Sequence, residues 1–273
     1  MKAVCREITR GGNTLGFVPT MGALHEGHLS LVRASKAQCR ATAVSIFVNP
    51  LQFGPTEDLD KYPRMMERDS KLLEELNVDV LFAPTVGEMY PPGATTYVEV
   101  ADLSGKLDGS SRPGHFRGVA TVVAKLFETV RPDRAFFGQK DAAQVAVLRR
   151  MVCDLDMDVE IVVCPIVREK DGLAMSSRNA YLNAEQRQQA LVLSRALMRV
   201  SHEVDLGERD PRRLVEIGTC VIAEEPAARL DYFEIVDPAS LQPLSEISRG
   251  ALVAVAAFIG NARLIDNILL APR

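Results

Sequence analysis

Short apolar runs alternate with amphipathic stretches over the first two thirds of the chain. The apolar runs are rich in Val, Ile, Phe or Ala and end at turn residues, which is typical of buried parallel strands. We expect strands at residues 15–19, 42–48, 80–83, 134–137 and 160–163. Apolar residues between them recur at three- and four-residue spacing, which predicts helices at residues 29–37, 63–76, 119–130 and 142–155. This alternation predicts an α/β fold in which helices cover both faces of a parallel sheet.

From about Ala184 onward the pattern changes. Helical stretches at 184–204 and 211–223 precede β-type segments at 230–236, 252–259 and 263–269. Helices followed by strands predict a separate α+β unit. The polar segment 168–172 carries a turn-forming Asp-Gly pair and lies before the change, so we expect a hinge near it. The predicted domains are residues 1–167 and a smaller one at 168–273.

Composition and charge narrow the class of protein. The 273 residues are 47% hydrophobic, which allows a substantial core, and the net charge of -4 without a run of Lys or Arg argues against nucleic-acid binding. The five cysteines are scattered without a C-x-x-C pair, so a disulfide framework or thiolate zinc site is not expected and a reducing cytoplasm fits. No signal-peptide pattern or membrane-length apolar run is present. We expect a cytoplasmic globular protein without nucleic-acid or membrane partners.

The segment from Gly16 to His28 joins a predicted strand to a predicted helix through glycines. A helix start presents free N–H groups and the positive end of its dipole, so this turn is a candidate anion site. His25 and His28 lie three residues apart, so we expect both rings on one face of the first helical turn, with Gly27 leaving room for a nucleotide. Such pairs are more often surface histidines, but two of the chain's four histidines lie in this one turn. The spacing does not match the zinc-protease motif, which needs histidines four apart.

Polar side chains also follow the second predicted strand. Asn49 and Gln52 lie where the carboxyl ends of parallel strands line a ligand crevice, and their amides suit directional, uncharged hydrogen bonds. A single glutamine in a loop is usually just solvated. Residues 55–64 are polar and turn-rich, so we expect a movable cover over the site.

The fourth predicted strand runs through Gly138 into Lys140, Asp141 and Gln144. The lysine can place a charge on a phosphate, the aspartate can accept from ribose hydroxyls, and Gln144 follows one turn later. Ordinary capping of a helix start explains the Lys-Asp pair equally well.

Two further segments are candidates for the same pocket. Hydroxyls beside a guanidinium at Ser176, Ser177 and Arg178 form a reasonable phosphate clamp, although Ser-Ser-Arg is common in loops. Residues 112–118 are rigid at Pro113, permissive at Gly114 and locally basic, but residue type alone assigns them no chemistry.

Together, these segments resemble the pantothenate synthetase family in identity and order, at residues 19–28, 47–53, 112–118, 137–141 and 175–179. H-x-G-H alone indicates only the wider nucleotidyltransferase superfamily, whereas Asn-Pro-Leu-Gln-Phe and Arg-Pro-Gly-His-Phe-Arg-Gly are far more specific. The resemblance covers nearly the whole chain. It implies a Rossmann-like domain with a smaller α+β domain closing over it, in a homodimer. It also implies a ligase that uses ATP and Mg²⁺ to activate pantoate as pantoyl adenylate and then joins it to β-alanine.

The resemblance further implies roles for individual residues. The implied catalytic residues are His25, His28 and Lys140, which would donate to the triphosphate. The implied ATP contacts are Met21, Gly22, Ala23, Leu24, His25, Glu26, Gly27, His28, Gly138, Gln139, Lys140, Asp141, Val167, Met175, Ser176, Ser177 and Arg178. Gln52 and Gln144 would bind pantoate, and Gln52 would also face β-alanine. Asp69 would lie near Mg²⁺, an ion that accepts a single protein carboxylate beside phosphate oxygens.

Two other functions share part of the pattern. A nucleotidyltransferase acting on a phosphate acceptor would keep the histidines and the clamp, but an anionic acceptor suits the neutral amides of Gln52 and Gln144 poorly. A non-catalytic nucleotide sensor would bind ATP without turnover. The chain also departs from the family at Ala142-Ala143, where a bulkier Tyr-Gln pair is common, and in the short stretch before Leu15.

Overall fold

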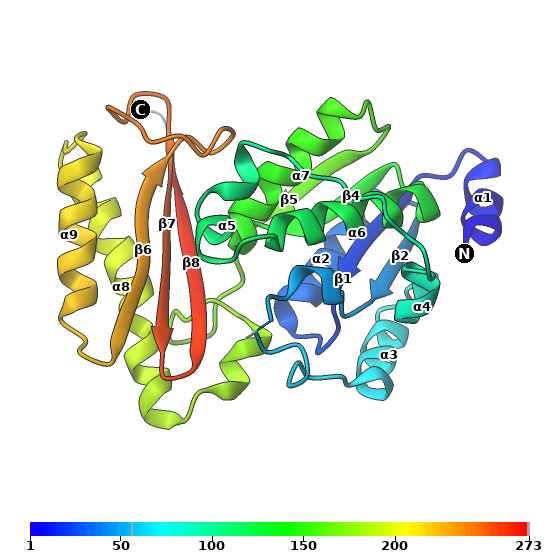
Figure 1. Cartoon of the computed structure of the whole chain (residues 1–273), viewed down its shortest axis with the longest axis horizontal. Coiled ribbons are helices and arrows are strands. Elements are labelled where there is room, and N and C mark those ends of the chain that lie inside the picture. The colour runs from blue at the N-terminus through cyan, green and yellow to red at the C-terminus, as the bar shows by residue number, and fades with distance from the viewer. Residues whose placement is uncertain (56, 272–273) are drawn as a thin grey trace.

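The chain folds around two β-sheets (Figure 1). The computed structural model describes residues 1–55 and 57–271, so Thr56 of the expected cover and residues 272–273 of the second predicted domain lie outside it. The larger sheet has five parallel strands in the order β3-β2-β1-β4-β5, and the smaller has three antiparallel strands in the order β6-β7-β8. The predicted α/β class, with a Rossmann-like sheet and a smaller α+β part, is confirmed.

The elements lie close to the predicted positions. The strands are β1 (Leu15–Thr20), β2 (Ala41–Ile46), β3 (Val80–Phe82), β4 (Arg134–Gly138), β5 (Glu160–Cys164), β6 (Ala228–Val236), β7 (Ala251–Ile259) and β8 (Ala262–Leu270). The α-helices are α1 (Lys2–Arg10), α2 (Glu26–Gln38), α3 (Met66–Glu75), α4 (Val86–Met89), α5 (Asp108–Ser111), α6 (His115–Val130), α7 (Ala142–Asp154), α8 (Ala184–Asp205) and α9 (Pro211–Ala223). Short 3₁₀ turns are η1 (Pro50–Gln52), η2 (Leu103–Gly105), η3 (Gln139–Asp141) and η4 (Ser177–Tyr181).

Both faces of the larger sheet are covered by helices. Successive residues of a strand point to opposite faces, so Phe17 packs with α6 and α7 whereas Val18 packs with α2 and α3. Phe136 and Phe137 of β4 divide in the same way between the two cores. This two-sided burial explains why the strands read as continuous apolar runs.

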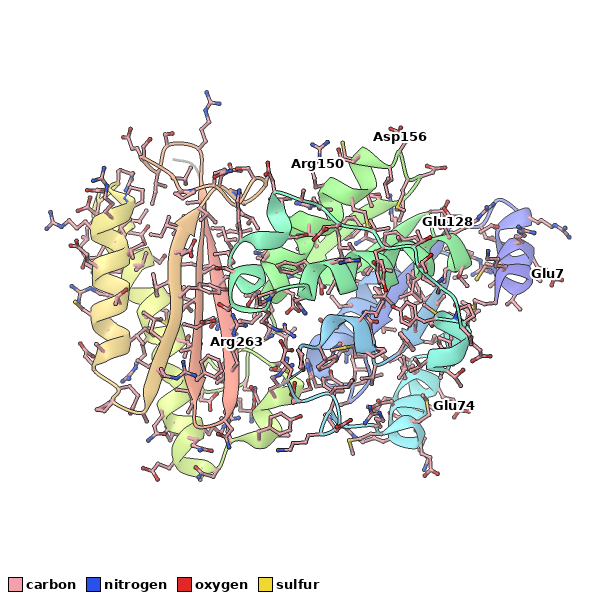
Figure 2. All side chains as sticks on the ribbon, viewed as in Figure 1. Glu7, Glu74, Glu128, Arg150, Asp156 and Arg263 are labelled. Atoms are coloured by element: carbon pink, nitrogen blue, oxygen red, sulfur yellow. The ribbon has the colours of Figure 1, made fainter. Side chains whose placement is uncertain are left out.

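The smaller sheet is a layer between two cores. Val253 and Val255 of β7 pack against α8 and α9, while Leu252 and Ala254 belong to the core of the larger part. In Figure 1, α8 and α9 accordingly lie on the side of this sheet that faces away from the larger part. In Figure 2, Arg263 on β8 lies between the two parts, whereas the other labelled charges lie on the outside. The seam therefore contains apolar contacts, and the ion pair of Arg263 with Asp108 also crosses it.

The helix α1 was not predicted. Met1, Cys5 and Ile8 pack on the larger core, at a helical spacing that spans too few residues to stand out. Among the described residues no helix is long and apolar enough to cross a membrane.

Candidate active site

Residues 25–28, here called the histidine turn, follow β1 and begin α2. His25 is the N-cap of α2 with extended backbone, so the two histidines do not share the first helical turn as expected. Their rings still lie together, with centroids 4.1 Å apart. His25 Nδ1 accepts from the N–H of Gly27 at 3.1 Å, and His28 Nδ1 accepts from the N–H of His25 at 3.3 Å. This reciprocal capping satisfies helix-start N–H groups and fixes both rings.

The same contacts set the protonation of both histidines. Burial lowers the pKa of His25 to about 4, with a further contribution from the charge of Lys140. Burial lowers the pKa of His28 to about 3, and His25 and Lys140 add to the effect. Both rings are therefore neutral at pH 7, and because each Nδ1 is an acceptor, the proton lies on Nε2. Each ring offers an Nε2–H donor without a buried charge.

Gly27 has a steric role besides the one expected from the sequence. A Cβ at this position would lie 2.9 Å from the Nδ1 and Cε1 atoms of His25. Glycine is therefore needed to admit the His25 ring, and its expected role in leaving room for a nucleotide stays a prediction.

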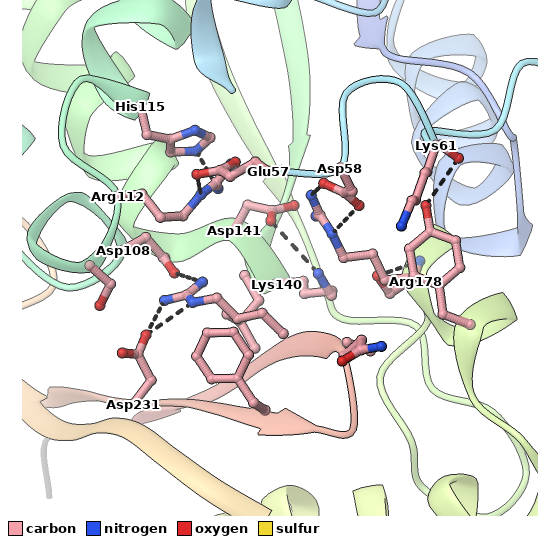
Figure 3. A pocket seen from close by; sticks show the side chains of 18 of the residues that line it. Glu57, Asp58, Lys61, Asp108, Arg112, His115, Lys140, Asp141, Arg178 and Asp231 are labelled. Carbon is pink, nitrogen blue, oxygen red and sulfur yellow. Dashed lines mark hydrogen bonds and ion pairs between the residues drawn. The ribbon is translucent and has the colours of Figure 1, made fainter. Parts of the chain in front are cut away.

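Two cavities lie along the seam between the sheets. The larger, of about 930 Å³, is drawn in Figure 3, and the smaller, of about 160 Å³, lies against the histidine turn. Lys140, Asp141, Ser176 and Arg178 line both, so the two cavities meet at these side chains. In the larger sheet the strand order reverses between β1 and β4, and ligands of such sheets bind beyond the carboxyl ends of the strands at that point. The histidine turn follows β1 and Lys140 follows β4, so both occupy this position.

Most of the implied ATP contacts come together here. The smaller cavity is lined by Met21, His25, Gly27, His28, Gly138, Lys140, Asp141, Val167, Met175, Ser176, Ser177 and Arg178. Gln144 lines the larger cavity. The described lining of these two cavities does not include Gly22, Ala23, Leu24, Glu26, Gln139, Gln52 or Asp69. The side chain of Glu26 is half-exposed and pairs with Arg33 on the outer side of α2.

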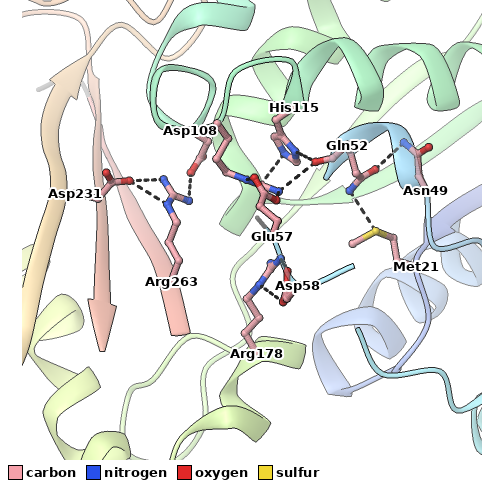
Figure 4. Close-up of polar contacts among 11 residues, drawn as sticks. Met21, Asn49, Gln52, Glu57, Asp58, Asp108, His115, Arg178, Asp231 and Arg263 are labelled. Atoms are coloured by element: carbon pink, nitrogen blue, oxygen red, sulfur yellow. Dashed lines mark hydrogen bonds and ion pairs between the residues drawn. The ribbon is translucent and has the colours of Figure 1, made fainter. Parts of the chain in front are cut away.

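Asn49 and Gln52 behave differently from each other (Figure 4). The buried Asn49 amide donates to Gln52 Oε1 and to the carbonyl of Gly118, each at 3.0 Å, and its Oδ1 accepts from the Tyr90 hydroxyl at 2.7 Å. The expectation that Asn49 offers its amide to a ligand is therefore wrong, because the protein uses it internally. Gln52 Nε2 lies 3.2 Å from Met21 Sδ, a weak acceptor that a ligand oxygen can replace.

The segment 112–118, which sequence reasoning left unassigned, braces Gln52. Arg112 Nη1 lies 3.0 Å from His115 Nε2, so this nitrogen must accept, and Nδ1–H donates to the carbonyl of Gln52 at 2.8 Å. Burial lowers the pKa of His115 to about 4, with Arg112 adding to the effect, so the ring is neutral. A Cβ at Gly118 would lie 2.2 Å from the carbonyl oxygen of Leu51, so glycine allows α6 to approach this turn closely.

The described part of the expected cover is tied to the site by ion pairs. Asp58 accepts from Arg178 Nε and Nη2 at 3.2 and 3.0 Å, and Glu57 accepts from Arg112 Nε and Nη2 at 3.0 and 2.6 Å. Tyr62 Oη lies 3.3 Å from Ser177 Oγ. Burial acts to raise the pKa of Asp58, but the hydrogen bonds and charge of Arg178 outweigh it and lower that pKa. Two carboxylates of the cover, Glu57 and Asp58, thus form ion pairs with Arg112 and Arg178 at the wall of the larger cavity.

Asp69 lies fully buried under the turn that precedes the histidines. Its Oδ1 accepts from the N–H of Leu24 at 2.9 Å, and its Oδ2 is buried without a hydrogen-bond partner. The described residues contain no group of three or more His, Cys, Asp or Glu side chains suited to a metal ion. Asp69 therefore has one carboxylate oxygen that makes no hydrogen bond within the described chain. A single such oxygen fits an ion that is held mainly by ligands from outside the chain.

Comparisons with known proteins agree on one family. The model of the pantoate-β-alanine ligase family matches residues 1–269. A pantothenate synthetase of Acidobacterium capsulatum is 66% identical over 96% of this chain and 88% of its own. The crystal structure of pantothenate synthetase from Thermus thermophilus matches with a TM-score of 0.92 at 50% identity, over 95% of this chain and 94% of that one. That of the pantoate-β-alanine ligase from Francisella tularensis, complexed with β-γ ATP and β-alanine, matches with a TM-score of 0.78 at 34% identity, over 97% and 94%. The chain belongs to the pantoate-β-alanine ligase family.

Proposed function

We propose that this chain condenses pantoate with β-alanine to give pantothenate, using ATP and passing through pantoyl adenylate. Family membership identifies the chain as an ATP-using ligase of pantothenate biosynthesis. A pantoate carboxylate oxygen attacks the α-phosphorus of ATP and pyrophosphate leaves. The amine of β-alanine then attacks the acyl carbon, and AMP leaves. The observation that best supports the first step is the convergence of two neutral imidazole donors and Lys140 on one small cavity.

Negative charge shifts onto the departing pyrophosphate in the first step. Donors fixed before the reaction stabilise that charge without reorganising. The Nε2–H groups of His25 and His28 and the ammonium of Lys140 are the donors that we assign to it, with Ser176 to Arg178 as a second group. We keep the other ATP contacts that the family resemblance implies. Of these, Gly22 to Glu26 and Gln139 would contact ATP through their main chain.

We assign the pantoate site to Gln52 and Gln144. Among the described residues, the hydrogen-bond acceptor of Gln52 Nε2 is the weak acceptor Met21 Sδ, and Gln144 lines the larger cavity. Neutral amides bind a hydroxy acid by directional hydrogen bonds and do not favour a phosphate acceptor. This argues against the alternative nucleotidyltransferase reaction. Because the Gln52 carbonyl is held by His115, the position of Gln52 is supported from both sides.

We also propose that Asp69 acts near Mg²⁺, with phosphate oxygens of ATP as the main ligands. The unbonded Oδ2 atom supports this assignment. The ion would neutralise phosphate charge when bound. In Asp69→Asn the oxygen that accepts from Leu24 is kept and the charge is lost. Calorimetry of ATP binding at several Mg²⁺ concentrations should then show weaker Mg²⁺ dependence in this variant, and unchanged dependence would assign Asp69 to bracing the turn alone.

Residues 168–273 are proposed as a lid domain that closes over the intermediate. Arg168, at the proposed boundary, makes a bidentate ion pair with Asp266 of β8 at 2.7 and 2.9 Å, which ties the connection to the smaller sheet. We further propose a cytoplasmic homodimer. Sedimentation equilibrium tests the second proposal directly, since a monomer at micromolar concentration would contradict it.

The order of events gives the decisive experiment. If the donors act on the triphosphate before the amine is needed, enzyme with ATP, Mg²⁺ and pantoate should release a burst of about one pyrophosphate per site. Adding β-alanine should then release AMP. The cover and the lid should slow hydrolysis of the adenylate by excluding water. No pyrophosphate before addition of the amine would rule out the two-step mechanism, and release that requires a phosphate acceptor would favour a nucleotidyltransferase.

A further inference from the structure

We propose that Asn267, on β8 of the smaller sheet, is a positioning residue for Lys140. Its side chain fixes the main chain of Gln139–Asp141, here called the lysine turn, and thereby the direction of the Lys140 side chain. The inference rests on the proposed function, because Lys140 is taken to act on the phosphates of ATP.

Three hydrogen bonds join Asn267 to the lysine turn. Its Nδ2 donates to the carbonyl of Gln139 at 3.0 Å and to the carbonyl of Lys140 at 2.9 Å. Its Oδ1 accepts from Gln139 Nε2 at 2.9 Å. Both donor hydrogens of the amide are therefore used on two successive carbonyls of the turn that carries the lysine. The residue is 3% exposed, so water cannot replace these bonds.

The lysine turn has no side-chain cap of its own. Gly138 at the start of the turn has no side chain to cap it, and Asp141 at the start of α7 makes no capping hydrogen bond. Asp141 Oδ1 lies 3.7 Å from Lys140 Nζ, beyond hydrogen-bond distance. Residues within the turn therefore fix its conformation weakly. The hydrogen bonds from Asn267 on the smaller sheet replace the absent side-chain caps.

Asn267 is itself held firmly. It lies in register opposite Ala254 on the central strand of the sheet. Its N–H donates to Asp266 Oδ1 at 2.8 Å, and Asp266 in turn accepts from both Nη atoms of Arg168. Groups that must be aimed accurately need support of this kind, because a displacement of about 1 Å can cost about 10²-fold in rate.

The test is a double-mutant cycle measured on pyrophosphate release with ATP, Mg²⁺ and pantoate. Asn267→Ala should lower kcat by about 10- to 100-fold and leave the KM for pantoate within about twofold, because the lysine is misplaced while the described hydrogen bonds of Asn267 do not include Gln52 or Gln144. In a Lys140→Ala background the same change should cost less than about twofold, since there is no lysine left to position. Asn267→Ser, which keeps one donor, should lie between wild type and Asn267→Ala.

A matched control separates positioning from loss of stability. Val253 on the same sheet is fully buried and faces α8 and α9, away from the lysine turn. Val253→Ala should lower the melting temperature and leave kcat unchanged. Full kcat in Asn267→Ala or Asn267→Ser would overturn the inference, as would an equal loss with and without Lys140. An inactive wild-type enzyme would instead contradict the proposed function.

Discussion

The histidine turn and the lysine turn line the same small cavity but are stabilised in opposite ways. Both follow a parallel strand of one sheet, at neighbouring positions where the strand order reverses. His25 and His28 cap each other's main chain within four residues. The lysine turn depends on Asn267, which lies 127 residues away from Lys140 in the chain. One half of the site is thus fixed by contacts within four residues, whereas the other half is held by hydrogen bonds from the smaller sheet.

This difference has a mechanical consequence. Movement of β8 relative to the larger sheet would act on the lysine turn through three hydrogen bonds, whereas no hydrogen bond among the described residues joins β8 to the two histidines. The side chains proposed to hold the phosphates would therefore respond separately to the proposed closure of the smaller part. A moving element is coupled to a site when direct contacts join them and when the element has two distinct arrangements.

The largest expected effect comes from removing a donor on either side of the cavity. His28→Ala and Lys140→Ala should each slow pyrophosphate release by about 10²–10³-fold, because both donors act on charge that develops at the phosphates. Pantoate binding should change much less. His202→Ala, at the end of α8, is a surface control and should be fully active. A normal rate of pyrophosphate release in either variant would remove that residue from the mechanism.

The next effect concerns binding rather than rate. Gln52→Ala should raise the KM for pantoate by about 5- to 150-fold, which corresponds to the 1–3 kcal/mol lost when a buried polar partner is removed. The affinity for ATP should hardly change, because Gln52 lies outside the lining of the smaller cavity. Initial rates at varied pantoate and at varied ATP concentrations distinguish weaker pantoate binding from weaker ATP binding. If ATP binding alone weakened, Gln52 would belong to the nucleotide site.

The two turns also show how far the sequence could be interpreted. The histidine turn was predictable because its residues are adjacent in the chain, and so was the sheet, whose buried strands carry unbroken apolar runs. Asn267 could not be found, because an asparagine in a β-type segment carries no local sign of a partner more than a hundred residues away. The same holds for Arg112 and His115, which were noticed as a motif but whose contact with Gln52 depends on tertiary packing.

Acid should destabilise the protein before its carboxylates titrate. Burial lowers the pKa values of His25, His28 and His115 below the 6.5 of a free imidazole. Between pH 6.5 and about 4 these histidines therefore bind protons in the unfolded chain but stay neutral in the folded chain. Stability should be complete above pH 6.5 and fall below it, by up to about 1.4 kcal/mol per pH unit for His28.

Urea denaturation at pH 7.5, 6.5 and 5.5 measures this effect, and the window ends above the range where Glu57 and Asp58 titrate. His28→Gln should reduce the slope of stability against pH. A free energy of unfolding that is constant across these values would contradict the neutral, buried state assigned to the histidine turn. The difference in slope between wild type and His28→Gln assigns that part of the pH dependence to the histidine turn.

The smallest expected effect lies where the cover meets the phosphate clamp. Asp58 accepts two hydrogen bonds from Arg178, and a partly exposed pair of this kind contributes only about 0.2–1 kcal/mol to stability. In the proposed site, ATP phosphates would compete with the Asp58 carboxylate for that guanidinium. Asp58→Asn keeps the shape of the side chain and removes its charge, so the KM for ATP should fall by about two- to fivefold with little change in melting temperature.

Asp60→Asn is the matched control for this prediction. Asp60 is also on the cavity wall but has no ion pair to Arg178 in the described contacts, so its replacement should leave the KM for ATP nearly unchanged. A KM for ATP that rises in Asp58→Asn would mean that the ion pair holds Arg178 ready for the phosphates instead of competing with them.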